Sequence, residues 1–257
     1  MYGLLFLVPK EKQKHHAAVQ CGSRTICGVR FFSVSVERSR SKVLQTRTLR
    51  KAARAMARAG VHTALFPREF AYPALFEKYG IRAAEDGYLR RMTAGAVARR
   101  VLAEHGIRAA ECHVALLGDH MSAELRKALM ELALHVRYTL LSAGGGGGEI
   151  CSVLRREYGV SVLRDPGQEQ LGQANLLLTF GKTAPCGTAG SLWLPCGEVT
   201  EADGFENAAP AVRYGAPPEV EEALRVDCNR NALLSILLEM GALRANELEV
   251  MEILQNA

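Results

Sequence analysis

The stretch from residue 136 to residue 165 constrains the fold more than any other part of the sequence. It begins with the apolar run VRYTLLSA, passes through the glycines at 144–148 and a helix-like segment, and ends with VSVL before Asp165. An apolar strand, a glycine turn, a helix and a second strand form a βαβ unit, which joins parallel strands. The sequence therefore predicts a parallel sheet that is covered by helices.

The same alternation extends to both sides of this unit. Apolar runs of strand length alternate with helical patterns, and Ser122 is a typical N-cap residue for one of these helices. Strands that are apolar on both faces indicate a sheet buried on both sides. Strands are predicted at 112–118, 137–143, 160–163, 174–180 and 191–195, helices at 122–135 and 148–158, and a polar connection at 167–173.

The fold class predicted is α/β: a three-layer Rossmann-like parallel sheet, a smaller N-terminal α/β segment and a helical C-terminal tail. The expected boundaries are 1–106, 107–200 and 201–257. In the first segment we expect strands at 3–8, 30–37 and 61–66, helices at 43–59, 73–79 and 86–105, and a loop over 10–28. In the tail we expect helices at 217–226, 229–240 and 247–255, with packing or a homo-oligomer contact as their role.

The glycine run suggests a cofactor. In a dinucleotide-binding fingerprint a strand leads into G-x-G-x-x-G and a helix, so that backbone amides approach the pyrophosphate, and a later acid binds the ribose. Here Asp165 follows Gly144 by 21 residues, at the end of the next predicted strand. The candidate cofactor-binding residues are Gly144, Gly146, Gly148 and Asp165, and the candidate cofactors are NAD and NADP.

In this respect residues 110–200 resemble NAD(P)-binding Rossmann domains. With the preceding α/β segment, the chain is similar to shikimate-dehydrogenase-like and glutamyl-tRNA-reductase-like enzymes. The resemblance implies an oxidoreductase. The catalytic Lys and Asp pair that such dehydrogenases carry has no motif match in this sequence, so no catalytic residue is transferred from them.

A second interpretation of the glycine run stays open. If 112–118 is the first strand of the repeat, the phosphate-binding turn reads LLGDHMS, and the carboxylate of Asp119 opposes phosphate there. The five glycines would then follow the second strand and form a permissive turn without a ligand. The order of the strands in the sheet decides between the two interpretations.

Charge is distributed unevenly along the chain. Residues 1–68 contain 14 Lys and Arg but only two acids, Glu11 and Glu37, whereas the remainder is acidic overall. Within 43–59 the helical spacing places one basic stripe opposite an apolar face, which suggests contact with a polyanion or a solvated surface. The stripe consists of Arg47, Arg50, Lys51, Arg54 and Arg58. Without aromatic interleaving or a recognition motif, nucleic acid is not the expected partner.

Residues with catalytic chemistry are scattered. They follow predicted strands, where open α/β sheets place their sites, but they form no complete constellation: Asp119, His120, Lys182, Thr183, Cys186 and the run from Phe66 to Glu69. The seven cysteines include no C-x-x-C pair, so no metal site is expected.

The expected protein is a Rossmann-like, non-catalytic or regulatory protein of the cytoplasm. The chain lacks an apolar run long enough for a membrane span, and no disulfide framework is indicated. Two alternatives remain: an NAD(P)-dependent oxidoreductase that uses 144–148, and a polyanion-binding protein that uses the basic stripe. The substrate, the partner and the presence of catalysis are left open.

Overall fold

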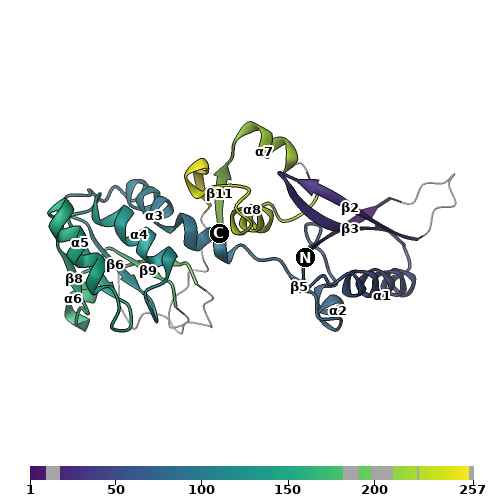
Figure 1. The fold of residues 1–257 in the computed structure, drawn as a ribbon, viewed down its shortest axis with the longest axis horizontal. Coiled ribbons are helices and arrows are strands. Elements are labelled where there is room, and N and C mark those ends of the chain that lie inside the picture. Colours follow the sequence, from purple (N-terminus) through teal and green to yellow (C-terminus); the bar gives the residue numbers. More distant parts are fainter. Residues whose placement is uncertain (10–17, 182–190, 198–210, 225, 255–257) are drawn as a thin grey trace. The chain divides into compact units, whose positions relative to one another are not determined.

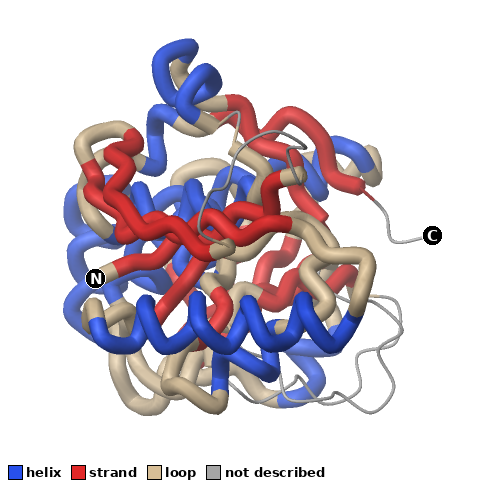
Figure 2. Tube along the Cα trace, turned by 90° about the vertical axis from the view of Figure 1, so that its right-hand side faces the viewer, coloured by secondary structure: helices blue, strands red, loops and turns tan. Residues whose placement is uncertain are grey.

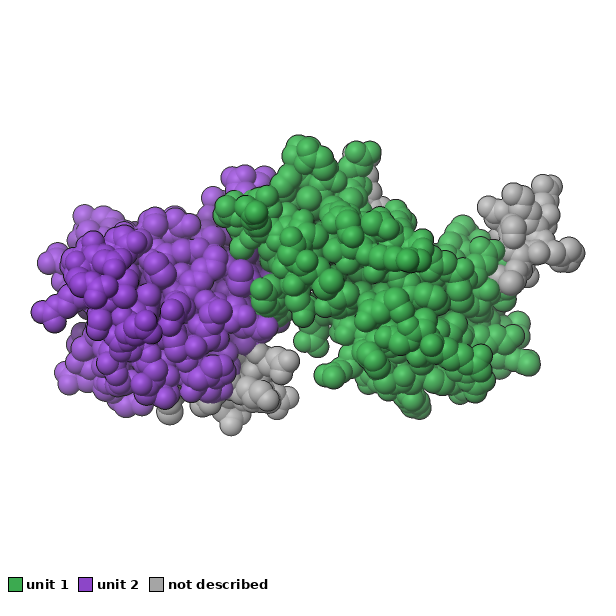
Figure 3. Space-filling model, viewed as in Figure 1, with its two compact units in different colours: residues 1–88, 216–247 green, residues 89–215, 248–257 purple. Residues whose placement is uncertain are grey.

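A computed structural model describes residues 1–9, 18–181, 191–197, 211–224 and 226–254 of the chain. The chain forms two compact units, which Figure 3 distinguishes by colour. Unit 1 contains residues 1–88 and 216–247, and unit 2 contains residues 89–215 and 248–257. The chain therefore leaves unit 1, builds most of unit 2, and returns to unit 1 before its last segment.

Unit 1 is built on a five-stranded mixed sheet, sheet A (Figure 1). The strand order is β2-β3-β1-β4-β5, and only the edge strand β2 runs antiparallel to its neighbour. The strands are β1 (Tyr2–Val8), β2 (Val19–Ile26), β3 (Val29–Glu37), β4 (Thr63–Leu65) and β5 (Arg82–Ala83). The helical elements are α1 (Lys42–Arg58), α2 (Pro73–Glu77), α7 (Pro218–Ala223), α8 (Arg230–Glu239) and the 3₁₀ turn η1 (Ala245–Glu247).

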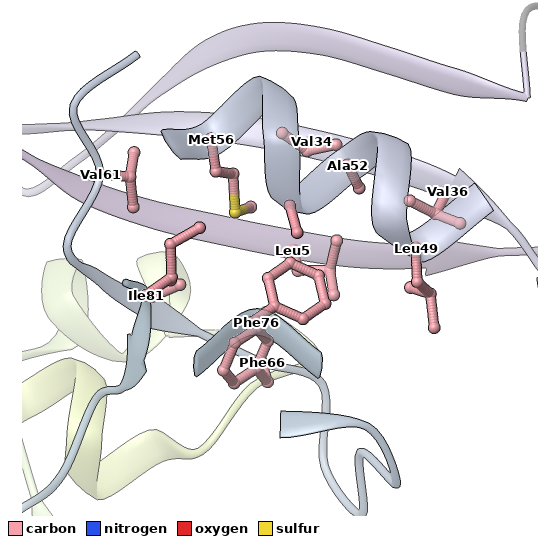
Figure 4. Close-up of a cluster of buried hydrophobic side chains, with 12 residues drawn as sticks. Leu5, Val34, Val36, Leu49, Ala52, Met56, Val61, Phe66, Phe76 and Ile81 are labelled. Carbon is pink, nitrogen blue, oxygen red and sulfur yellow. The ribbon is translucent and has the colours of Figure 1, made fainter. Parts of the chain in front are cut away.

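The long helix α1 lies against one face of sheet A (Figure 2). It begins close to residue 43, as predicted, and the Ser41 hydroxyl caps it by accepting a hydrogen bond from the Leu44 amide at 3.5 Å. Its apolar stripe is buried, as its spacing predicted. Figure 4 shows the side chains of this stripe in one cluster with residues of the strands, of α2 and of the segment after β4, including Leu5, Val34, Leu49, Ala52, Met56, Phe66 and Phe76.

Unit 2 contains an all-parallel five-stranded sheet, sheet B, in the order β10-β9-β6-β7-β8. Counted from β6 along the chain, this is the doubly wound order 3-2-1-4-5 of Rossmann-like sheets, and β6 is the first strand. The strands are β6 (His113–Leu117), β7 (Tyr138–Ser142), β8 (Val162–Arg164), β9 (Leu176–Thr179) and β10 (Leu192–Pro195). The Rossmann-like α/β class predicted from the sequence is confirmed.

Helices cover both faces of sheet B. The helices are α3 (Gly87–Glu104), α4 (Ala123–Ala133), α5 (Gly148–Tyr158) and α6 (Gln168–Gly172). The amine of Lys127 in α4 donates to the Met92 carbonyl in α3 at 2.9 Å, so these two helices pack side by side. On the face that carries Ala115 and Leu177, Leu171 from α6 and Trp193 from β10 complete a second apolar cluster. Sheet B therefore lies between two apolar layers.

Two predictions for the polar segments are wrong. Within the predicted loop 10–28, β2 forms although its outer residues from Gln20 to Thr25 are exposed, because pairing with β3 holds it rather than apolar burial. The first part of that loop, 10–17, lies outside the described residues. Residues 168–172 form the short helix α6 instead of a connection, and Gly167 accommodates its start.

The C-terminal segment 247–255 was predicted as a helix, but β12 (Glu249–Leu254) pairs antiparallel with β11 (Ala211–Gly215). The turn η1 stands before β12, and in it the Glu247 carboxylate accepts a hydrogen bond from the Arg244 amide at 2.7 Å. Because EVMEIL alternates, it fits a strand when a partner strand is present. Across the described residues, none of the helices combines the length and apolar character that crossing a bilayer requires.

Candidate functional site

The switch point of sheet B lies where β6 and β9 end, since the chain proceeds from these strands toward opposite edges of the sheet. In open parallel sheets, ligands bind at this position. The turn Gly118–Met121 follows β6, and Ser122 then caps α4 by accepting from the Leu125 amide at 3.1 Å. This turn holds the position of the phosphate-binding turn of a dinucleotide-binding sheet.

The carboxylate of Asp119 fills the switch point. A Cβ atom on Gly181, at the end of β9, would lie 2.5 Å from Asp119 Oδ1 and 2.8 Å from Oδ2. A side chain at position 181 would therefore collide with the carboxylate. The neighbouring His120 is exposed, and its backbone carbonyl accepts from the Ser122 amide at 3.0 Å. The turn that leads into α4 thus carries an acidic group beside Gly181.

The glycine run follows β7, the second strand of the repeat, and lies one strand away from the switch point. It packs against the turn after β6. The Asp119 carbonyl oxygen occupies the space that a Cβ on Gly144 would need, and the Met121 Cβ lies 3.0 Å from the Cβ position of Gly146. At Gly147 the equivalent position is 2.6 Å from a Leu141 methyl group. Close packing of two turns accounts for these glycines without a ligand.

Asp165 and the end of the glycine run lie at the carboxyl ends of two neighbouring strands of sheet B. The Arg164 Nη1 atom lies 3.0 Å from the Cβ position of Gly148, which is the first residue of α5. Arg164 also forms an ion pair with Asp165 at 3.7 Å. Asp165 has a left-handed backbone (φ +48°) just after β8. The guanidinium of Arg164 therefore lies near both predicted cofactor residues, Gly148 and Asp165.

Three of the cysteines in the described residues, Cys112, Cys151 and Cys196, have a raised thiol pKa. Burial raises the pKa of Cys196 to about 12 and that of Cys112 to about 11. Burial also raises the pKa of Cys151 in the first turn of α5, with a lowering contribution from Arg164. A raised thiol pKa disfavours the reactive thiolate. The candidates Lys182, Thr183 and Cys186 lie outside the described residues, and the described residues hold no cluster that fits a metal ion.

The predicted basic stripe is present on the outer face of α1. Its five side chains, Arg47, Arg50, Lys51, Arg54 and Arg58, are all exposed. None forms an ion pair with a residue in the described part of the chain. Arg54 lies over the Tyr79 ring with 6.0 Å between Cζ and the ring centroid. The charge of this face is therefore available to a partner in solution.

A cavity of about 500 Å³ lies within unit 1, at the carboxyl ends of β4 and β5 and the start of α8. The sequence had singled out one wall, the run from Phe66 to Glu69. The other wall, Asn229 to Asn231, was missed. The sequence signal in this wall is Asn229, a residue type that often caps helices. In the structure its side chain caps α8 by accepting from the Ala232 amide at 3.2 Å.

Comparison with known proteins identifies no family. No family model matches the chain, and no curated protein does. Among solved structures, the catalytic subunit of M. jannaschii aspartate transcarbamoylase is 12% identical, with a TM-score of 0.34 over 93% of this chain and 87% of that chain. L-tryptophan dehydrogenase from Nostoc punctiforme is 8% identical, with a TM-score of 0.36 over 95% of this chain and 75% of that chain.

A chorismate mutase/shikimate 5-dehydrogenase fusion protein from Clostridium acetobutylicum is 8% identical, with a TM-score of 0.24 over 76% of this chain and 86% of that chain. Similarities of this size transfer no function. The strand order of sheet B, β8-β7-β6-β9-β10, is itself the basis for describing unit 2 as a Rossmann-like α/β unit.

Proposed function

We propose that this chain is a non-catalytic, regulatory Rossmann-like protein whose parallel sheet binds no dinucleotide at its switch point. One observation carries the proposal: the Asp119 carboxylate lies against Gly181 at the switch point, and open α/β sheets bind the pyrophosphate of a dinucleotide at this point. We also propose a cytoplasmic location, because the six described cysteines are free thiols.

The physical reason is electrostatic and steric. A pyrophosphate binds at such a turn through backbone amides and the positive end of the following helix, and it needs glycines for close approach. Here a carboxylate occupies the turn, and two like charges about 4 Å apart repel each other by about 4 kcal/mol near a protein surface. The glycines that would serve the approach are used in packing the turn after β7 against the turn after β6.

The alternative is an NAD(P)-dependent oxidoreductase that binds its cofactor between β7 and β8. Gly144, Gly146 and Gly148 would then face the pyrophosphate and Asp165 the ribose. The guanidinium of Arg164 beside Gly148 supports this alternative, since it adds positive charge at the start of α5. The ion pair between Arg164 and Asp165 argues against it, because a ribose would have to displace it.

A thermal-shift titration with NAD, NADP and their reduced forms tests the proposal. A ligand that binds only the folded state stabilises it by about 2.7 kcal/mol at a concentration of 100 Kd. We expect no shift at millimolar nucleotide. A saturable rise in Tm that disappears in Asp165→Asn would contradict the proposal and favour the oxidoreductase. Arg155→Gln, an exposed change on α5, is the control for nonspecific effects.

A second candidate function is polyanion binding by α1. The observation that favours it is the row of five exposed basic side chains without ion-pair partners in the described residues. Such a row can neutralise a line of phosphates or sulfates and release their counterions, which makes binding salt-dependent. The absence of interleaved aromatic residues argues for contact with a charged backbone rather than with bases.

Salt elution from heparin tests this candidate. We expect retention that weakens steeply with salt, and its loss in the triple variant Arg47→Glu, Arg50→Glu and Arg54→Glu. The matched control is Arg126→Glu, Arg155→Glu and Arg156→Glu, which makes the same change of net charge on exposed positions of α4 and α5. Equal loss in both variants would mean that net charge, and not the α1 face, causes retention.

A further inference from the structure

The cavity of unit 1 is large enough for a small metabolite. Its volume is about 500 Å³, within the range of roughly 300–1,000 Å³ of ligand pockets. It opens at the carboxyl end of a parallel strand pair, β4 and β5, opposite the first residues of α8. All of its lining residues belong to unit 1, so the cavity is a property of that unit alone.

Two opposite charges line this cavity without pairing to each other. The Arg68 Nε donates to the Cys228 carbonyl at 3.5 Å, and the terminal guanidinium nitrogens bond to nothing in the described residues. Glu69, the next residue, forms no ion pair or hydrogen bond within the same part of the chain. Its backbone is held at a φ of +57°, which a glutamate rarely adopts. The cavity is therefore lined by a positive and a negative side chain that are adjacent in sequence but do not pair with each other.

The second cationic group of the cavity, Arg230, is already neutralised. The Arg230 guanidinium binds both carboxylate oxygens of Glu221, at 2.8 Å and 2.5 Å. This bidentate pair holds the start of α8 against the preceding helix α7. Arg68 and Glu69 are therefore the cation and the anion that a ligand in this cavity would meet.

The remaining wall is apolar and rigid. The Phe66 and Phe70 rings stack with centroids 4.8 Å apart and planes at 14°, and Pro67 and Pro73 lie beside them. Phe66 is only 8% exposed, so its ring is fixed by the core beneath it. An apolar side chain placed on these rings would lose its water at little conformational cost.

We propose that this cavity binds a hydrophobic α-amino acid. Its carboxylate would pair with Arg68, its ammonium group with Glu69, and its side chain would lie on the wall formed by Phe66, Phe70 and the two prolines. A guanidinium forms a planar fork that matches a carboxylate. This site goes beyond the proposed functions of the chain, because those concern sheet B of unit 2 and the outer face of α1 and not this cavity.

Isothermal titration of the full chain with four probes separates the parts of the proposal. L-Phenylalanine carries both charges and the apolar group, hydrocinnamate lacks the ammonium, phenethylamine lacks the carboxylate, and glycine lacks the side chain. We expect L-phenylalanine to bind at least about tenfold more tightly than each of the others, since each of them lacks one of the three contacts. No binding of L-phenylalanine, or equal binding of hydrocinnamate, would overturn the proposal.

Two variants with a matched control then assign the charges. In Arg68→Gln we expect about a tenfold loss for L-phenylalanine. In Glu69→Gln we expect hydrocinnamate to bind as tightly as L-phenylalanine, because the partner of the ammonium is gone. Arg30→Gln removes an exposed arginine of β3 outside the cavity and should leave all affinities unchanged. Preserved discrimination against hydrocinnamate in Glu69→Gln would refute the assignment of Glu69, and circular dichroism confirms that each variant is folded.

Discussion

The backbone carbonyl of Asp119 occupies the space that a side chain on Gly144 would need. These residues follow neighbouring strands, β6 and β7, and their contact fits the two turns together at the carboxyl edge of sheet B. The contact explains why a glycine stands at 144 in structural terms. The turn that follows the first strand of the repeat, β6, therefore carries an acid, and the glycine run follows the second strand instead.

Replacing Gly144 by alanine should destabilise the protein far more than replacing Gly145. Both residues have positive φ, +53° and +81°, so both substitutions incur about 1 kcal/mol of backbone strain. A Cβ at Gly145 meets nothing within 4 Å, whereas one at Gly144 meets the Asp119 backbone. We expect a further loss of about 2 kcal/mol for Gly144→Ala. Urea unfolding measures both values, and equal losses would show that the two turns do not touch.

The contact between Asp119 and Gly181 predicts coupled mutations. Gly181→Ala should destabilise by about 1 kcal/mol, because the new methyl group forces the Asp119 carboxylate aside. In the background of Asp119→Ala the same substitution should be nearly neutral. A double-mutant cycle on unfolding free energies therefore gives a coupling of about 1 kcal/mol. Additive effects would mean that the carboxylate does not fill the switch point.

The hydrogen bond from the Tyr2 hydroxyl to Glu239 Oε2, 2.7 Å long, predicts a pH effect. Burial, reinforced by this bond to the carboxylate, raises the pKa of Tyr2 to about 12 from 10. The folded state thus retains the phenolic proton to higher pH than the unfolded state. This contribution to stability is complete below pH 10 and is lost as the pH rises through 12.

Unfolding curves of the wild type and Tyr2→Phe between pH 9 and pH 12 test the effect. The difference in stability between the two proteins should be constant up to about pH 10 and then shrink, because other alkaline titrations are common to both. A difference that stays constant through this window would mean that the hydroxyl does not hold its proton through Glu239.

Much of the fold could be predicted from the sequence. The strands of sheet B are apolar on both faces, and α1 has a clear buried stripe. These elements can therefore be recognised from their own residues, without knowing which elements they contact. The missed strands, β2 and β12, depend on a partner strand for their structure. The exposed residues of β2 contain no apolar alternation to detect, and the residues just before β12 form only a single 3₁₀ turn.

The site was less predictable, because it depends on which strands are neighbours. The residues of the switch point are far apart in sequence, and Asp119 meets Gly181 only because β6 pairs with β9. The cavity wall at Asn229 meets the run after β4 only because the chain returns to unit 1. Composition and periodicity contain no information about either pairing.

Energy transfer from Trp193, the single tryptophan of the chain, to a reduced nicotinamide tests the central claim most directly. Trp193 lies in β10, and a sheet of five strands is about 20 Å wide, so a dinucleotide anywhere along this edge would accept excitation from the indole. If the Asp119 carboxylate blocks the switch point, NADH and NADPH should show no saturable emission on excitation of Trp193. Saturable emission that NAD or NADP displaces would contradict the account.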